Sequence, residues 1–261
     1  MVKVAVLFAA GTNCDEETIF AFQKAGAEAS RLHINYLKKR KDALNGYSIL
    51  CIPGGFTYGD YISAGKILAN ELLTSLKETI KKFLERGGIV LGICNGFQVL
   101  VKAGLLPAFH HYFEKPSVTL DWNDSLHFEC RWVYLKTNEH SPCLFTKGLP
   151  PIVTLPIAHA EGKFIPKSNG ILERLKKNNQ IVFTYVNEKG EEVGYPYNPN
   201  GSIGNVAGIC DPEGRVFGLM PHPERFVFRE QSPLLRRKPS LPDGFLIFQN
   251  AVEYAQRFLS D

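Results

Sequence analysis

A cysteine between two glycines is the residue of this chain best suited to covalent chemistry. Cys94 lies at the centre of the segment GICNG, residues 92–96, after an apolar run at 89–93 and before a helical pattern at 95–103. This is the thiol form of the G-x-S-x-G nucleophile elbow, a sharp strand-to-helix turn that needs small neighbours. The positive end of the helix dipole favours a thiolate there. We therefore predict that Cys94 is a nucleophile rather than a buried structural cysteine.

A nucleophilic cysteine needs a general base and a group that orients the base. His222 and Glu224 lie in the segment MPHPE, residues 220–224, directly after an apolar run at 215–220. The flanking prolines favour an extended backbone, in which residues two apart project to the same side. We predict that one nitrogen of His222 faces Cys94 while the other contacts Glu224, as in a catalytic triad.

A second histidine and glutamate have the same spacing. His159 and Glu161 follow an apolar run at 152–157, so the sequence leaves this pair open as an alternative. We rank it second, as an element at the edge of the site or facing a partner, with a structural histidine as an equal alternative. His110 and His111 lack a third ligand and the six cysteines form no C-x-x-C pair, so we expect no metal site.

An acyl-transfer site also needs backbone N–H groups that stabilise a developing oxyanion. The N–H of Asn95, directly after the nucleophile, is one predicted donor. The segment PGGF, residues 53–56, ends another apolar run, and the N–H of Gly55 is the second predicted donor. Glycines at this place let the main chain approach a substrate closely. Neither G-x-x-x-x-G-K-[ST] nor G-x-G-x-x-G occurs, so the sequence contains no phosphate-binding loop of these two kinds.

The elements that must position these residues alternate in the first half of the chain. Strands are expected at 3–9, 29–34, 47–52 and 89–93, and helices at 15–26, 63–85 and 95–103. This alternation is typical of an α/β fold with a parallel, doubly wound sheet, whose sites lie at the carboxyl ends of the strands. The second half predicts antiparallel β additions, with strands at 127–137, 152–159, 180–187, 206–210 and 215–220 and helices at 168–177 and 244–259.

The composition excludes several classes of protein. The chain has 261 residues, 44% of them hydrophobic, and its 30 Lys and Arg against 26 Asp and Glu give a net charge of +4, which disfavours a nucleic-acid binder. The longest stretch without a formal charge, 87–101, is too short for a membrane helix. The cysteine pattern predicts a reduced, cytoplasmic chain. No composition break is seen, so we predict one domain over 1–261 with an extended loop at about 226–244.

Several segments together resemble the class I (triad) glutamine amidotransferases. The elbow and the MPHPE segment are shared across that class. The segment PIAHAEGKF (156–164) is also part of the resemblance. The similarity narrows to the glutaminase subunits of phosphoribosylformylglycinamidine synthase, a purine-biosynthesis enzyme, through the segments GTNCDEE (11–17), GGFTYGD (54–60) and NPNGS (198–202). The resemblance covers most of the chain.

The resemblance implies a flavodoxin-like, mostly parallel sheet flanked by helices and a hydrolase reaction on L-glutamine. Cys94 would attack the side-chain amide, a γ-glutamyl thioester would form, ammonia would leave and water would complete the hydrolysis. His222 would move the proton and Glu224 would hold the imidazole. Gln98, one turn along the elbow helix, would contact bound glutamine.

The resemblance also implies partners. It places ATP and Mg²⁺ on a separate synthetase chain, with no cofactor on this one, and a small accessory subunit is a further candidate partner. The synthetase would use the ammonia to convert formylglycinamide ribonucleotide to the amidine, as a ligase. Residues 225–240 carry a net charge of +4, and we expect the partner to engage this loop. Two alternatives stay open: a glutaminase that serves another ATP-dependent synthetase, and a non-hydrolytic redox sensor with an elbow cysteine.

Overall fold

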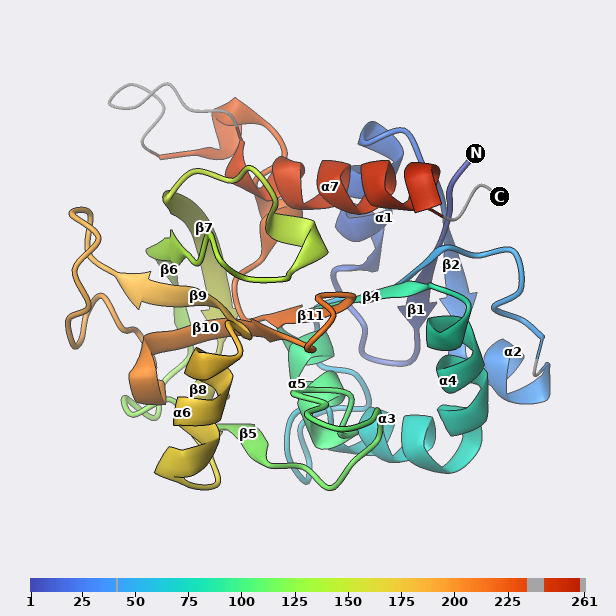
Figure 1. Ribbon diagram of the computed structural model, residues 1–261, viewed down its shortest axis with the longest axis horizontal. Coiled ribbons are helices and arrows are strands. Elements are labelled where there is room, and N and C mark those ends of the chain that lie inside the picture. The colour runs from blue at the N-terminus through green and yellow to red at the C-terminus, as the bar shows by residue number, and fades with distance from the viewer. Residues whose placement is uncertain (41, 234–241, 259–261) are drawn as a thin grey trace.

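The computed structural model describes residues 1–40, 42–233 and 242–258. A nine-stranded sheet runs through its centre, with the strand order β2-β1-β3-β4-β11-β10-β9-β6-β7 (Figure 1). Neighbouring strands in the first part of this order are parallel: β2 (Glu28–His33), β1 (Lys3–Phe8), β3 (Ile49–Ile52), β4 (Ile89–Ile93) and β11 (Val216–Leu219).

The second half of the chain extends this sheet with antiparallel strands. They are β10 (Val206–Cys210), β9 (Ile181–Val186), β6 (Glu129–Thr137) and β7 (Ile152–His159). A separate two-stranded sheet joins β5 (Val118–Asp121) to β8 (Lys163–Pro166). The α/β class and the antiparallel additions in the second half are therefore confirmed.

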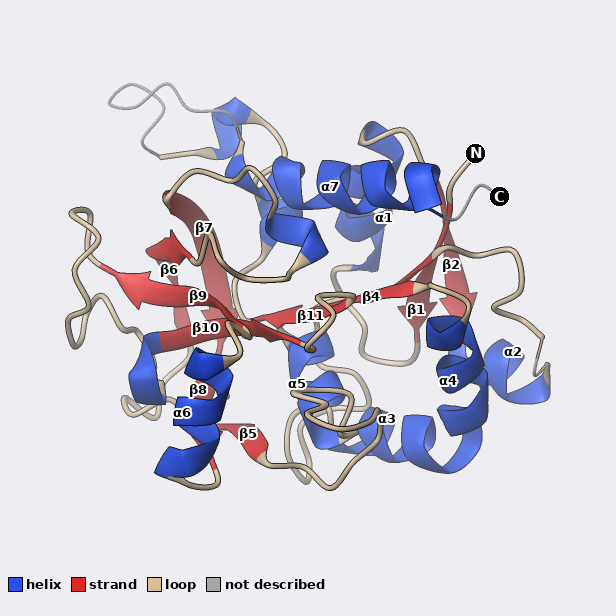
Figure 2. Ribbon diagram, viewed as in Figure 1, coloured by secondary structure: helices blue, strands red, loops and turns tan. Residues whose placement is uncertain are grey.

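Helices cover both faces of the parallel strands (Figure 2). One face carries α1 (Asp15–Lys24) and α7 (Asp243–Phe258), and the other carries α3 (Lys66–Glu71), α4 (Lys77–Glu85) and α5 (Asn95–Lys102). Two further helices, α2 (Ile34–Lys39) and α6 (Asn169–Lys177), lie toward the ends of the sheet. No helix within the described residues is long and apolar enough to cross a membrane.

The helix expected at 63–85 begins later and is interrupted. Gly65 has a left-handed backbone with φ of 72°, so the helix starts at Lys66, and a π-helical turn, Leu72–Leu76, separates α3 from α4. A Cβ at Gly65 would lie 2.9 Å from a methyl group of Val99, so only glycine fits where α3 packs on the elbow helix α5. The start of α3 is therefore set by packing against α5, which cannot be read from helical periodicity in the sequence.

The strand register brings the predicted site residues to one edge. The central strand β4 pairs with β3 through Gly92 and Ile52 and with β11 through Ile93 and Leu219. All three strands are parallel, so the segments that follow them leave the sheet side by side. Every residue of β4 is buried, which makes this edge a rigid support for the turn that follows.

Candidate active site

Cys94 lies on the strained turn between β4 and α5. Its φ is 51°, its N–H donates to Leu219 O at 2.8 Å, and its carbonyl accepts from Gln98 N at 3.1 Å. A Cβ at Gly96 would overlap the carbonyl of Ile52, and one at Gly92 would lie 2.5 Å from Leu100 Cδ1. The two glycines are therefore required by close backbone packing, as the elbow motif predicts.

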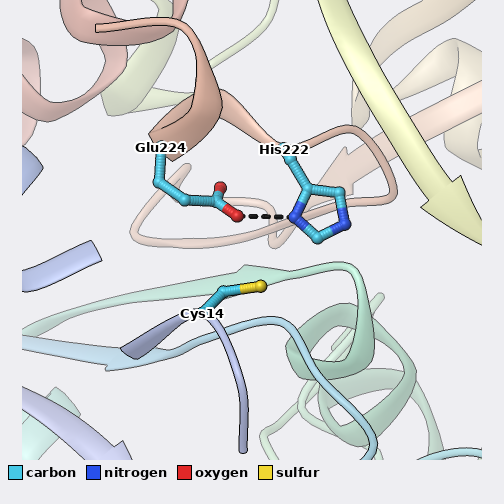
Figure 3. Close-up of side chains that lie close together, drawn as sticks. All are labelled: Cys14, His222 and Glu224. Carbon is cyan, nitrogen blue, oxygen red and sulfur yellow. Dashed lines mark hydrogen bonds and ion pairs between the residues drawn. The ribbon is translucent and has the colours of Figure 1, made fainter. Parts of the chain in front are cut away.

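His222 and Glu224 form a buried pair beside this turn. His222 Nδ1 and Glu224 Oε1 are 2.5 Å apart, and both residues are almost completely buried (Figure 3). The backbone differs from the extended segment that was predicted, because residues Pro223–Arg225 form a 3-10 turn with proline at its start. His222 N donates to Pro156 O at 2.8 Å, which fixes the start of this turn against β7. This turn places the Glu224 carboxylate within hydrogen-bond distance of His222 Nδ1.

The electrostatic surroundings make His222 a strong base. Burial opposes its protonated form, but the Glu224 carboxylate and the thiols of Cys94 and Cys14 outweigh burial and hold the pKa of His222 well above its usual range. Its Nε2 is buried and has no hydrogen-bond partner among the described residues, so this atom is available to accept a proton. Cys94 Sγ donates to Ala158 O at 3.6 Å, and the roles of Cys94, His222 and Glu224 as nucleophile, base and orienting group stay predictions.

His159 and Glu161 do not pair with each other. Burial and the neighbouring His222 lower the pKa of His159 to about 3, and its Nδ1 lies 3.1 Å from Asn123 Oδ1. Both carboxylate oxygens of Glu161 accept from Ala64 N, at 3.0 and 3.2 Å, and Lys102 Nζ is 3.6 Å away. The equal spacing in sequence therefore leads to two different roles. His159 is a neutral wall residue, and Glu161 fixes a loop.

The predicted oxyanion donors and Gln98 lie around Cys94. Gly55 has φ of 141°, and a Cβ there would lie 2.5 Å from Asn13 N. The Asn95 side chain accepts from Thr57 N at 3.3 Å and donates to Gln98 Oε1 at 2.9 Å. Gln98 Nε2 donates to the carbonyl of Glu161 at 2.6 Å, so protein groups already contact both ends of this amide. The roles of Gly55, Asn95 and Gln98 toward a substrate stay predictions.

These residues surround a cavity of about 320 Å³ at the carboxyl edge of the sheet. Its walls come from segments that are distant in the sequence: Asn13, Cys14, Gly55, Phe56, Asp60, Ala64, Cys94, Gln98, Phe128, Cys130, Ala158, His159, Ala160, Glu161, His222 and Arg225. A cavity of this size suits a small molecule of amino-acid dimensions.

Cys14 is a site residue that the sequence analysis did not identify. Its sulfur points toward the imidazole of His222 (Figure 3), and donor atoms of Cys14, His222 and Glu224 lie within 4.8 Å of one another. These are donor types that Zn²⁺ binds. However, His222 and Glu224 already share a hydrogen bond, and Cys14 Sγ accepts from Arg225 Nη2 at 3.2 Å. The only signal in the sequence was its place in the segment GTNCDEE.

Gly54 packs against the imidazole of His222, and this contact allows a prediction. A Cβ at Gly54 would lie 2.8 Å from His222 Cε1 and 3.3 Å from Cys14 Sγ. Gly54→Ala should displace the ring and lower kcat/KM for the glutamine hydrolysis that the resemblance implies by about 100-fold, with little change in thermal stability, because small misplacements of a base are costly. Gly194→Ala is the matched control, since a Cβ there meets nothing within 4 Å. Equal steady-state rates in both variants would contradict this role.

Comparison with known proteins identifies the family. The CobB/CobQ-like glutamine amidotransferase domain matches residues 1–255. Phosphoribosylformylglycinamidine synthase subunit PurQ of Archaeoglobus fulgidus is 46% identical, over 98% of both chains, and that of Dehalococcoides mccartyi is 45% identical, also over 98% of both. A chain in the structure of PurLQS from Thermotoga maritima is 32% identical, with a TM-score of 0.72 over 97% of this chain and 98% of that one. The chain therefore belongs to the glutamine amidotransferases, and within them to the family of phosphoribosylformylglycinamidine synthase subunits.

Proposed function

We propose that this protein is the glutaminase subunit of a phosphoribosylformylglycinamidine synthase. It hydrolyses L-glutamine and supplies the ammonia to a synthetase chain. The observation that carries this proposal is the buried His222–Glu224 pair, 2.5 Å apart, beside Cys94 on its strained elbow. Family membership supports the same reaction class, and a redox sensor would have no use for the carboxylate of Glu224.

The reaction begins with proton transfer from Cys94 Sγ to His222 Nε2. The thiolate attacks the amide carbon of glutamine, and the N–H groups of Gly55 and Asn95 stabilise the oxyanion that develops. His222 then donates its proton to the leaving nitrogen, so that ammonia departs and a γ-glutamyl thioester remains. A water molecule gives a proton to His222 and attacks the thioester, which releases glutamate. The proton on His222 returns to the departing sulfur of Cys94 and restores the thiol. Throughout, Glu224 holds the imidazole and stabilises its charged form.

The acceptor chemistry belongs to another chain. The relatives carry the name of one synthase subunit, and the solved structure is named as an assembly, PurLQS. We therefore propose a separate synthetase partner that binds ATP and Mg²⁺ and converts formylglycinamide ribonucleotide to formylglycinamidine ribonucleotide, with a small accessory subunit as a further partner. The six cysteines are free thiols, which suits the cytoplasmic location that we propose.

Labelling with a glutamine-mimicking electrophile tests the proposed function. Stoichiometric reaction at Cys94, blocked by L-glutamine and accompanied by glutamate release from glutamine, is the expected result. Because Cys14 lies beside the same histidine, the labelled residue must be identified by peptide mapping. Labelling at another cysteine, or labelling that glutamine does not block, would exclude the glutaminase.

We also expect the partner to accelerate glutamine hydrolysis. Glutamate release by the isolated chain should rise at least about 10-fold when the synthetase and its substrates are added, because small shifts of His222 and Glu224 change triad geometry. Full activity of the isolated chain would contradict this prediction. The basic residues Arg236, Arg237 and Lys238 lie outside the described residues. Their joint replacement by alanine tests the loop, and unchanged assembly and turnover would remove it from the mechanism.

A further inference from the structure

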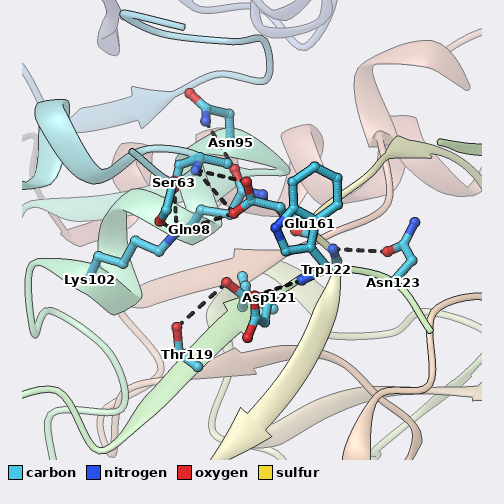
Figure 4. Close-up of polar contacts among 12 residues, drawn as sticks. Ser63, Asn95, Gln98, Lys102, Thr119, Asp121, Trp122, Asn123 and Glu161 are labelled. Atoms are coloured by element: carbon cyan, nitrogen blue, oxygen red, sulfur yellow. Dashed lines mark hydrogen bonds and ion pairs between the residues drawn. The ribbon is translucent and has the colours of Figure 1, made fainter. Parts of the chain in front are cut away.

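The loop between β3 and α3 is anchored at both ends by hydrogen bonds to residues in or next to the active-site cavity. At its start, Thr57 N donates to the side chain of Asn95 at 3.3 Å. At its end, Ala64 N donates to the carboxylate of Glu161, and Lys102 Nζ donates to Ser63 Oγ at 2.6 Å (Figure 4). The residues between these anchors therefore have a defined position relative to the nucleophile.

A tight turn within this loop directs Asp60 to the cavity. Tyr58 and Gly59 both have left-handed backbones, with φ of 63° and 68°, and Gly59 N donates to Phe56 O at 2.7 Å. The hydroxyl of Tyr58 donates to Glu71 Oε2 at 3.2 Å, which ties the turn to α3. Asp60 lines the cavity from an exposed position, and Tyr61, the next residue, is 93% exposed.

Asp60 is the carboxylate of this cavity that lacks a cation. Glu161, the other carboxylate on the wall, has Lys102 Nζ at 3.6 Å and the N–H of Ala64. Asp60 forms no ion pair within the described part of the chain. Partial burial and the charge of Glu161 raise the pKa of Asp60, and Lys102 offsets only part of this effect. A ligand that brings a positive charge would relieve this repulsion.

We propose that Asp60 binds the α-ammonium group of the substrate glutamine and so determines specificity for the amino acid over other primary amides. This inference rests on the proposed glutaminase function. Glutamine carries one cation, the α-ammonium, at the end opposite the amide that Cys94 attacks. A carboxylate on an anchored loop, in the same cavity as Cys94, is suited to receive it through a charge-assisted hydrogen bond.

The test compares L-glutamine with glutaramic acid, which has the same amide and carboxylate but no α-ammonium. In the complex with the synthetase, Asp60→Asn should lower kcat/KM for glutamine by about 10- to 100-fold, mostly through KM, because a hydrogen bond to a charged group is lost. Hydrolysis of glutaramic acid should change by less than about twofold. Asp42→Asn, an exposed carboxylate on a remote loop, is the matched control and should leave both rates unchanged.

The outcomes separate the two claims. Absence of glutamate release by the wild-type complex would overturn the proposed function itself. If the wild-type complex hydrolyses glutamine and Asp60→Asn keeps the wild-type preference for glutamine over glutaramic acid, only the role of Asp60 would be overturned. If Asp60→Asn loses turnover of both compounds, protection of Cys94 from iodoacetamide decides. Equal protection of Cys94 in Asp60→Asn by glutamine and glutaramic acid would support the proposal. Protection by glutamine that exceeds protection by glutaramic acid by the same ratio as in the wild type would overturn it.

Discussion

Replacing Cys94 with alanine should abolish glutamine hydrolysis, with a loss of turnover of at least about 10⁴-fold, because no thioester can form. The fold should persist. Alanine retains the Cβ, and the backbone contacts of residue 94 to Leu219 and Gln98 do not involve the thiol. Glutamate release and the thermal unfolding midpoint, measured on the same preparation, check both statements.

Cys130→Ala is the control for this experiment. Cys130 also lines the cavity, is exposed, and belongs to β6 rather than to the elbow. We expect it to keep near wild-type turnover. If loss of Cys130 proved as damaging as loss of Cys94 in folded protein, the nucleophile would be wrongly assigned.

The second large effect is expected at His222, where alanine should lower turnover by about 10³-fold, because neither the thiol nor the leaving nitrogen would have a proton partner. Glu224→Ala should cost less, since the carboxylate orients the imidazole and takes no proton. His159→Ala is the matched variant: the ring is equally buried in the same cavity, but its pKa, lowered to about 3, keeps it neutral. Glutaminase rates of the three folded variants rank the roles, and an equal loss in His159→Ala would refute the base assignment.

The elbow could be predicted from the sequence because its motif occupies five consecutive residues between an apolar run and a helical pattern. Gly92 is required by contacts to Leu100 and Gly96 in the helix that follows, whereas Gly96 is required by the carbonyl of Ile52 in the adjacent strand. The alternation of short apolar runs with helices likewise reports the parallel half of the sheet, since each unit is built from consecutive residues. The fold class followed from such local patterns.

Other parts of the site depend on contacts that spacing does not encode. His159 and His222 each precede a glutamate by two residues, yet a proline-initiated 3-10 turn folds only Glu224 back onto its histidine. Cys14 and His222 are more than 200 residues apart in the sequence but adjacent in the fold. Asp60 becomes a candidate only because Glu161, the other carboxylate of the cavity, pairs with Lys102. Tertiary contacts of this kind leave no periodic signal in a single sequence.

The hydrogen bond from Cys94 N to Leu219 O affects how easily the site opens locally without global unfolding. It continues the ladder between β4 and β11, and His222 follows β11 by only three residues. Nucleophile and base are thus extensions of one strand pair at the centre of the sheet, where local opening requires nearly the full free energy of global unfolding. Fluctuations that fray the outer loops leave this strand pair in register, so the backbone that supports Cys94 and His222 stays in place while the side chains beyond it can still shift.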